Sequence, residues 1–299
     1  IYLLMDKYLV GPETVRMLGL RHPWVLADKF TKKWSAPNVG DLALLCDENN
    51  KPLATALIDP NDRVVARVLG PPGIKLDAGW FRNRLQKAKR LREQAGLDET
   101  DAYRLVNAEG DGLPGLTIDC YAGYLMVQLY TPAWDNYLPT LLEVLQELFA
   151  PLGIYRKLRP QETRQLEAKS GNKQYSRLLS GQPAPTPLEV KENGLLFYTD
   201  LGEGLNTGLF PDQRRHRLDL MQRIKGKRFL NLFAFTGAFS VAAAAAGARQ
   251  VTSVDVSPKY LNIARDNFSL NRLNPKRHNF IVGDVFTELA KMQQAGDRF

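Results

Sequence analysis

The sequence is poor in the residues that build disulfide frameworks and metal sites. Among its 299 residues there are two cysteines, Cys46 and Cys120, and three histidines. The two cysteines stand far apart and outside any C-x-x-C spacing, which favours a reducing, cytoplasmic setting. The histidines His22, His216 and His278 form no group with the spacing of metal ligands, so we expect no metal site.

Long hydrophobic runs are missing as well. No segment approaches the ~18 uninterrupted apolar residues that a membrane-spanning helix needs, so we expect no membrane partner. The first ten residues are interrupted by Asp6 and Lys7 and carry no cleavage site, which argues against a secretory signal.

The overall composition is that of a globular protein with an excess of basic residues. Apolar residues make up 44% of the chain, which is ample for packed cores, and a length of 299 residues predicts two or three domains. The net charge of +8 and the pI near 9.4 favour a polyanionic partner.

A glycine-rich phosphate loop is absent from the segment around which the chain is organised, Lys227 to Asp255. This segment predicts a strand, a tight break, a buried helix and a second strand, at 229–235, 236–237, 238–246 and 251–254. The two strands should be parallel with a right-handed crossover, and such sheets bind ligands beyond the carboxyl ends of their strands. Asp255 stands at one such end and could hold two ribose hydroxyls.

The ligand expected at this edge is a nucleoside rather than a dinucleotide. A dinucleotide site requires G-x-G-x-x-G, so that the backbone can approach a pyrophosphate. This turn has a single glycine, and Asn231, Phe233 and Phe235 stand before it. A nucleoside ligand without phosphate, such as S-adenosylmethionine (SAM), makes no such demand. An ordinary α/β unit without a ligand is the alternative.

A second carboxylate follows on a neighbouring strand. Ser257–Pro258 has the pattern of an N-cap followed by a first-turn proline, and the helix that it starts should run to about Asn271. Asn279–Val282 then predicts a third strand, which ends in Gly283–Asp284. Asp284 could accept a hydrogen bond from an adenine amino group, directly or through water.

The first 70 residues predict a small β-rich domain. Arg21, His22 and Trp24 combine basic and aromatic side chains in a way that suits RNA, while core packing is the alternative for Trp24. Three strand-like runs separated by turn clusters have the spacing of a small barrel or sandwich, at 39–45, 52–58 and 63–69.

Residues 71 to about 190 predict a linker helix and a second, α+β module. The helix over 80–93 carries six cations and one acid, so we expect Arg82, Arg84, Lys87 and Lys89 to face an RNA backbone, with a solvated face as the alternative. The other elements expected are strands at 103–106, 116–119, 124–130 and 153–158, a helix at 136–149, a loop at 171–187, and a hairpin of strands 188–192 and 195–199 over Asn193–Gly194.

The stretch from Gly204 to Arg217 leads into the organising strand. Asp212 is expected to cap a helix there, and the start of this helix should lie beside the ligand turn. A helix N-terminus favours an anion, so Thr207, Phe210 and Gln213 are candidates for contact with a ligand carboxylate. A capped structural helix is the alternative.

Five stretches in a fixed order carry a family resemblance: R-L-V-N-A-E-G-D-G-L-P-G-L-T-I-D, T-G-L-F-P-D-Q-R, N-L-F-A-F-T-G-A-F-S-V-A-A, V-T-S-V-D-V-S and V-G-D-V-F. Together they resemble the bacterial 23S rRNA cytosine-5 methyltransferases, and the resemblance spans nearly the whole chain. It implies an α/β protein with β-rich N-terminal modules. The domains that it implies are a PUA-like RNA-binding domain (1–70), a linker helix with a middle α+β domain (71–190), and an incomplete Rossmann-like class I methyltransferase domain (191–299). It further implies SAM as the cofactor and large-subunit rRNA as the partner, with a homodimer left open.

The resemblance also implies a cofactor site shared by a helix start and three strand ends. The stretch from Arg21 to Trp24 would help to hold RNA. Two departures, Ala234–Phe235 for a common Cys-Tyr and Pro211 for a common leucine, remove no chemical group on which the site depends. The implied cofactor residues are Thr207, Phe210, Asp212, Gln213, Arg214, Asn231, Phe233, Ala234, Phe235, Thr236, Gly237, Asp255, Val256, Asp284 and Val285.

The family's catalytic motifs are not found in the sequence. The family has a fourth strand that ends in an acid-Pro-Pro motif and a later cysteine that attacks C6 of cytosine, after which a base removes the C5 proton. The sequence ends at Phe299, about where that strand should begin. Cys46 and Cys120 match neither of the family's catalytic positions, and Cys120 has the setting of a packed thiol. We therefore expect the catalytic residues beyond Phe299 and a chain that cannot complete the reaction.

Three other interpretations stay open. The first is a non-catalytic RNA-binding protein with a vestigial methyltransferase domain. The second is a nucleotide-dependent oxidoreductase, which the glycine-poor turn disfavours. The third is a methyltransferase that acts on another base, such as guanine.

Overall fold

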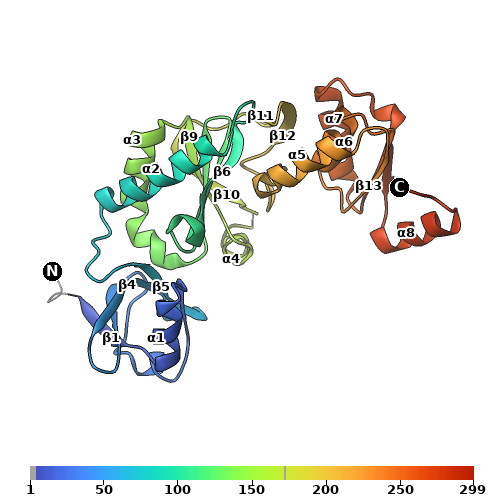
Figure 1. Ribbon diagram of the computed structural model, residues 1–299. Helices are drawn as coiled ribbons and strands as arrows, with labels where there is room; N and C mark the ends of the chain where they lie inside the picture. The colour runs from blue at the N-terminus through green and yellow to red at the C-terminus, as the bar shows by residue number, and fades with distance from the viewer. Residues whose placement is uncertain (1–4, 172) are drawn as a thin grey trace.

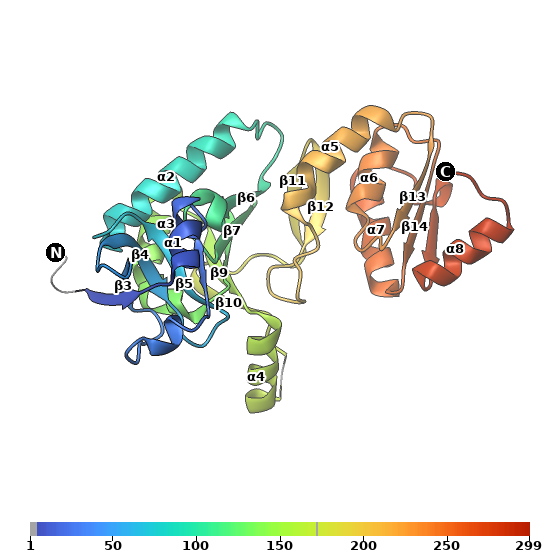
Figure 2. The ribbon, with the colours of Figure 1, turned by 60° about the horizontal axis from the view of Figure 1, so that its bottom comes forward.

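The computed structural model describes residues 5–171 and 173–299, which form three sheets and a hairpin in chain order (Figure 1). The N-terminal sheet lies at one end of the molecule and the C-terminal sheet at the other, with the hairpin between the second and third sheets (Figures 1 and 2). Within the described residues, no helix is both long and apolar enough to cross a membrane.

The first sheet lies within residues 6–70 and contains five strands. The three longest confirm the predicted runs to within three residues, whereas the short outer strands and the first helix were not predicted, because a few residues give too little periodicity. The order is β1 (Asp6–Leu9), β3 (Leu42–Cys46), β4 (Pro52–Ile58), β5 (Val64–Gly70) and β2 (Trp24–Leu26), accompanied by α1 (Pro12–Gly19) and the 3₁₀ helix η2 (Thr31–Lys33).

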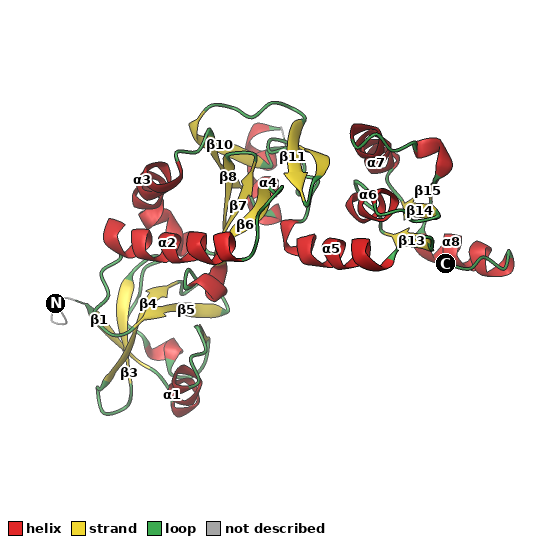
Figure 3. Ribbon diagram, turned by 45° about the horizontal axis from the view of Figure 1, so that its top comes forward, coloured by secondary structure: helices red, strands yellow, loops and turns green. Residues whose placement is uncertain are grey.

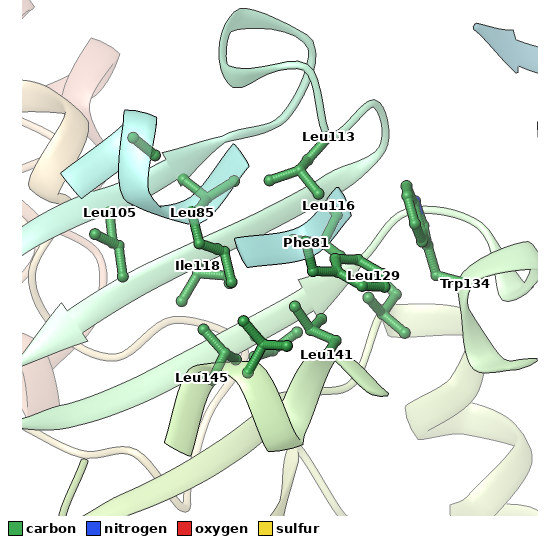
Figure 4. Packing of buried hydrophobic residues seen from close by; sticks show 14 of the residues in the cluster. Phe81, Leu85, Leu105, Leu113, Leu116, Ile118, Leu129, Trp134, Leu141 and Leu145 are labelled. Atoms are coloured by element: carbon green, nitrogen blue, oxygen red, sulfur yellow. The ribbon is translucent and has the colours of Figure 1, made fainter. Parts of the chain in front are cut away.

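The second sheet forms the largest core of the molecule. Helices α2 (Ala78–Gln94) and α3 (Leu138–Phe149) pack on it, and Phe81 and Leu85 of α2 meet Leu141 and Leu145 of α3 in one buried cluster (Figure 4). The strand order is β10 (Ser176–Gly181), β9 (Gly153–Lys157), β8 (Tyr124–Leu129), β7 (Leu116–Tyr121) and β6 (Ala102–Asn107), with the 3₁₀ helix η3 (Ala108–Asp111) between β6 and β7.

Two expectations for this region need correction, and one helix was not predicted. The predicted loop at 171–187 contains β10, which pairs antiparallel with β9, so partner pairing overrides a Ser- and Gly-rich sequence. The predicted helix at 136–149 begins as the 3₁₀ helix η4 (Pro132–Tyr137) and becomes α-helical only at Leu138. The helix α4 (Pro160–Ser170) was not predicted, because its sequence is mostly polar and carries no apolar stripe.

The predicted hairpin and three-stranded parallel sheet are both confirmed. The hairpin consists of β11 (Leu188–Glu192) and β12 (Leu195–Thr199), with φ of +51° at Asn193 and +79° at Gly194. The third sheet has the order β13 (Arg228–Leu232), β14 (Gln250–Asp255) and β15 (Asn279–Val282). Helices α6 (Ala238–Ala245) and α7 (Pro258–Leu270) cover one face, and α8 (Val285–Gln294) covers the other (Figures 2 and 3).

A buried ion pair joins the hairpin to the helix that precedes the third sheet. Nε and Nη2 of Arg217, on α5 (Arg214–Arg223), donate to the two carboxylate oxygens of Glu192 at 2.7 and 2.6 Å. The two side chains are only 2% and 1% exposed. Nη2 also donates to the carbonyl oxygen of Phe210 at 2.7 Å, and the guanidinium lies 5.4 Å from the ring centroid of Phe239 on α6.

The substitution Arg217→Met should lower the free energy of unfolding by about 3–5 kcal/mol, because it leaves the Glu192 carboxylate buried without its cation. Urea denaturation measures the change. Arg223→Met removes a cation from the same helix, where it pairs with Asp219 at the surface, and should change stability by less than ~1 kcal/mol. Removing both charges with Arg217→Met and Glu192→Met should recover much of the loss. Equal effects of the two single arginine variants would contradict the expectation.

Candidate functional site

The turn after β13 has an unusual backbone conformation. Phe233, Phe235 and Gly237 have φ of +55°, +51° and +76°, and this is why β13 ends at Leu232 instead of the predicted Phe235. Non-glycine residues in the left-handed region cost about 1–2 kcal/mol each, and they persist where other contacts fix them. At Gly237 a Cβ would lie 2.7 Å from Cβ of Ala264 on α7, so this position needs glycine for both its φ and its close packing.

Asp255, at the end of β14, fixes the 233–237 turn. Its Oδ2 accepts a hydrogen bond from the backbone N–H of Phe235 at 2.8 Å, and its Oδ1 accepts one from the N–H of Ser257 at 2.9 Å. A carboxylate offers about four acceptor positions, so two remain for a ligand. The sequence predicts that this turn and the Asp255 carboxylate lie at one edge of the sheet, and in the structure they are in direct contact.

Large apolar side chains stand exposed along the carboxyl ends of β13, β14 and β15. Phe233 is 66%, Val256 65% and Phe286 74% exposed, and Val282 is half exposed. The rings of Phe233 and Phe286 are 6.4 Å apart and nearly perpendicular. Exposed apolar groups gathered on adjacent elements are typical of a binding surface, so this edge is a candidate site. Phe286 was not among the site residues predicted from the sequence, although it directly follows the predicted residues Asp284 and Val285.

Asp284 caps the helix that follows β15. Its Oδ1 accepts hydrogen bonds from the backbone N–H and the hydroxyl of Thr287 at 2.9 and 3.0 Å. These bonds, led by the backbone N–H, hold the pKa of the Asp284 carboxyl below its usual value. The carboxylate is exposed at the same edge as Phe286 and keeps acceptor capacity for a ligand amino group.

The segment before α5 meets the turn through aromatic contacts. The Phe210 ring lies 5.6 Å from that of Phe235, which in turn packs edge-on against Tyr260 at 4.4 Å. Thr236 donates from its hydroxyl to the carbonyl oxygen of Gly208 at 2.5 Å. These contacts bring the 204–217 stretch beside the turn, as the sequence predicted.

Several side chains of this stretch have other partners than those expected. Asp212 does not cap α5, because it lies inside the 3₁₀ helix η5 (Pro211–Gln213) and its carboxylate accepts from the side chain of Gln213. The Thr207 hydroxyl is buried against the Tyr121 hydroxyl at 2.9 Å. Arg214 is buried too and donates to the carbonyl oxygen of Gly96, and this burial lowers the pKa of its guanidinium.

Asn231 and Ser240 form a polar contact below the turn. The Asn231 side-chain amide donates to the Ser240 hydroxyl at 2.9 Å, and that hydroxyl lies 2.7 Å from the hydroxyl of Ser253. Asn231 therefore orients the start of α6 against β13 and β14, while it remains only half buried.

The residues predicted to contact RNA are partly engaged within the chain. Nε1 of Trp24 donates to Glu109 at 2.8 Å. On α2, Arg82 pairs with Glu147, and Arg84 donates to the carbonyl oxygen of Leu69. Arg21 and Lys87 are exposed, His22 is half buried against Trp24, and the ammonium of Lys89 lies 5.7 Å from the ring centroid of Phe149. Their role in RNA binding stays a prediction.

A cavity of about 380 Å³ lies between the second sheet and the 205–212 segment. Lys157 of β9 lines it and is buried, with its Nζ donating to the carbonyl oxygen of Gly204 at 2.6 Å. Burial lowers the pKa of this ammonium to about 8. On the cavity's polar side lie Arg104 and Asp119, which form an ion pair at 2.8 Å. Among the described residues, no three His, Cys, Asp or Glu side chains gather as a metal site.

Two known families match the chain. Residues 104–298 match the family described as S-adenosylmethionine-dependent methyltransferase, and residues 10–71 match a PUA-like domain. The first match covers well over half of the chain and includes the whole of the third sheet.

Individual relatives point the same way. Ribosomal RNA large subunit methyltransferase I from Escherichia coli O139:H28 is 34% identical over 281 residues, which are 93% of this chain and 70% of that protein. Two solved structures are each 29% identical over 98% of this chain. One is a candidate SAM-dependent methyltransferase from Streptococcus mutans, with a TM-score of 0.85 over 74% of that chain. The other is a candidate methyltransferase complexed with S-adenosylhomocysteine (SAH), with a TM-score of 0.86 over 73% of that chain.

The pKa of Lys157 predicts a pH dependence of stability. Since the pKa falls from 10.5 to about 8 on folding, the unfolded chain binds more protons between these values, and the contribution of Lys157 to stability rises with pH across this window. The stability of the wild type relative to Lys157→Met should therefore increase from pH 8 to pH 10 in urea denaturation. Lys259→Met, which removes an exposed ammonium, serves as the control. A pH-independent difference for Lys157→Met would contradict the expectation.

Proposed function

The chain belongs to the family of SAM-dependent methyltransferases, and from this premise we propose that it methylates large-subunit rRNA at C5 of a cytosine. The RNA part of the proposal rests on the Escherichia coli relative, whose name gives large-subunit rRNA as its substrate. The cytosine part rests on the sequence resemblance described above. SAM supplies the activated methyl group.

The observation that carries the proposal is the contact between Asp255 and the 233–237 turn. It sets a carboxylate with free acceptor positions beside exposed apolar side chains at one sheet edge. In this proposal Asp255 accepts from the ribose hydroxyls and Asp284 from the adenine amino group. Phe233, Val256 and Phe286 contact the faces of the adenine ring, with Val285 beside it.

The methionine end of the cofactor would lie toward Phe210. This ring contacts Phe235, and the first turn of α5 follows it, so backbone N–H groups and the side chain of Gln213 are available to a ligand carboxylate. The remaining turn residues, Asn231, Ala234, Thr236 and Gly237, would shape the site through their backbone. Thr207 and Arg214, which have partners elsewhere, would support the segment instead of touching the cofactor.

Methylation at C5 of cytosine needs a nucleophile at C6 and a base for the C5 proton. Neither of the two thiols in the described residues is suited to act as the nucleophile that attacks C6. Burial raises the pKa of the Cys46 thiol and raises that of Cys120 to about 11, so neither is a ready thiolate. We therefore assign the attack on C6 to neither of these two thiols.

The cofactor site is tested with Phe233→Ala. Phe233 is mostly exposed, so its removal should not lower the melting temperature, yet the loss of its contact with adenine should weaken SAH binding by about tenfold. Isothermal titration calorimetry measures both proteins with SAH and with NAD, and we expect no NAD binding. Phe299→Ala removes another exposed ring and should leave SAH affinity unchanged. Unchanged SAH affinity in Phe233→Ala would refute the assigned site.

The substrate is tested in the source organism. Disrupting the gene should remove one 5-methylcytidine from 23S rRNA, as measured by mass spectrometry of RNA fragments, and returning the intact gene on a plasmid should restore it. Loss of a different methylated nucleoside would contradict the cytosine assignment, and an unchanged rRNA would contradict the rRNA assignment.

A further inference from the structure

Two cavities meet at one aromatic residue, Tyr130. The first, of about 690 Å³, lies between the end of β8 and the start of α4. The second is the cavity of about 380 Å³ beside Lys157. Tyr130 lines both cavities, and we call the two together the Tyr130 groove.

The Tyr130 ring is exposed but held in place. It is 38% exposed, although it directly follows a buried strand. Its backbone N–H donates to the carbonyl oxygen of Gly115 at 2.8 Å, and its carbonyl oxygen accepts from Nη1 of Arg159 at 2.6 Å. The same guanidinium lies 5.2 Å from the ring centroid. An anchored ring backed by a cation is a suitable platform for the stacking of an unpaired base.

The charges that line the Tyr130 groove are balanced. In the first cavity Arg156, Arg159 and Arg164 face Asp62, Asp135 and Glu162. In the second cavity Arg104 and Lys157 face Asp119 and Asp212. A lining with no net charge has little attraction for the phosphate backbone, whereas its many donors and acceptors can bind base edges. The groove therefore suits bases more than phosphates.

The second cavity borders the cofactor edge, by which we mean the 233–237 turn and the carboxyl ends of β13, β14 and β15, where we assign the cofactor. Phe210 and Asp212 form its far wall, and the Phe210 ring contacts Phe235 of the 233–237 turn. Gln128 and Lys157 line the same cavity and could donate hydrogen bonds to a base. A base in this cavity would thus lie next to the residues that we assign to the cofactor.

We propose that the Tyr130 groove binds a single-stranded segment of the RNA substrate, with one base stacked on Tyr130 and its neighbour in the second cavity, facing the cofactor edge. This inference rests on the proposed function, because it takes RNA as the substrate. It adds a recognition surface whose lining includes no residue of α2 or of the Arg21–Trp24 stretch. Since enzymes that modify a base must remove it from its stack, a segment already unpaired is the substrate that this groove selects.

The test uses a fluorescently labelled single-stranded oligoribonucleotide of about ten nucleotides, within the length that such grooves cover. Anisotropy titrations compare the wild type with Tyr130→Ala, Tyr130→Phe and Phe299→Ala. Tyr130→Ala should bind about tenfold more weakly because it removes the stacking ring. Tyr130→Phe keeps the ring and should bind as the wild type does, and so should Phe299→Ala, whose ring lies outside the groove. The loss in Tyr130→Ala should be the same at low and high salt, since a balanced lining releases few counterions.

Three outcomes would overturn the inference: equal binding by Tyr130→Ala and the wild type, equal binding of the oligonucleotide and its duplex, or no oligonucleotide binding by a wild type that binds SAH. SAH titration and thermal melting of each variant separate these results from failure of the cofactor site or of folding. Loss of SAH binding by the wild type would refute the proposed function itself.

Discussion

The ion pair between Arg217 and Glu192 is the contact on which the ligand-binding half of the molecule depends. Two buried charges stay stable only when their hydrogen bonds are complete, so the pair holds the hairpin, α5 and the Phe210 carbonyl in one geometry. Phe210 in turn contacts Phe235 in the turn that faces the ligand edge. A shift of the hairpin would therefore move the start of α5 relative to the third sheet.

A second set of contacts joins the hairpin and the second sheet to the same turn. The side chain of Asn267 on α7 accepts from the backbone N–H of Tyr198 in β12 and donates to the carbonyl oxygen of Thr236, both at 2.9 Å. The Thr236 hydroxyl reaches Gly208, next to Thr207, whose hydroxyl contacts Tyr121 of the second sheet. The 233–237 turn and the second cavity of the Tyr130 groove, which Tyr121 and Thr207 line, are thus connected through hydrogen bonds of 2.5 to 2.9 Å.

Regular periodicity decided what could be predicted from the sequence. The parallel strands, the Asn193–Gly194 hairpin and the Ser257 cap follow from local signals, and the structure confirms them. The edge strand β10 and the polar helix α4 depend on partners distant in sequence, so local patterns missed them. Side-chain direction was harder still: the Thr207 hydroxyl turns to Tyr121 of the second sheet, and Asp212 accepts from the adjacent Gln213 instead of capping α5. Tyr130 went unnoticed because nothing local distinguishes it from other strand-end tyrosines.

The geometry of Asp255 bears on how the cofactor binds. Its carboxylate accepts from the backbone N–H groups of Phe235 and Ser257, so contacts within the protein hold both the carboxylate and the strained turn. A site that does not rearrange loses little conformational entropy on binding, and more of the contact energy appears as affinity. The left-handed conformations of Phe233 and Phe235 cost stability, but Phe233 is exposed and, in the proposed site, available to the adenine ring. In the proposed cofactor site, the strained turn thus has a role in ligand binding that the folding of the sheet alone does not require.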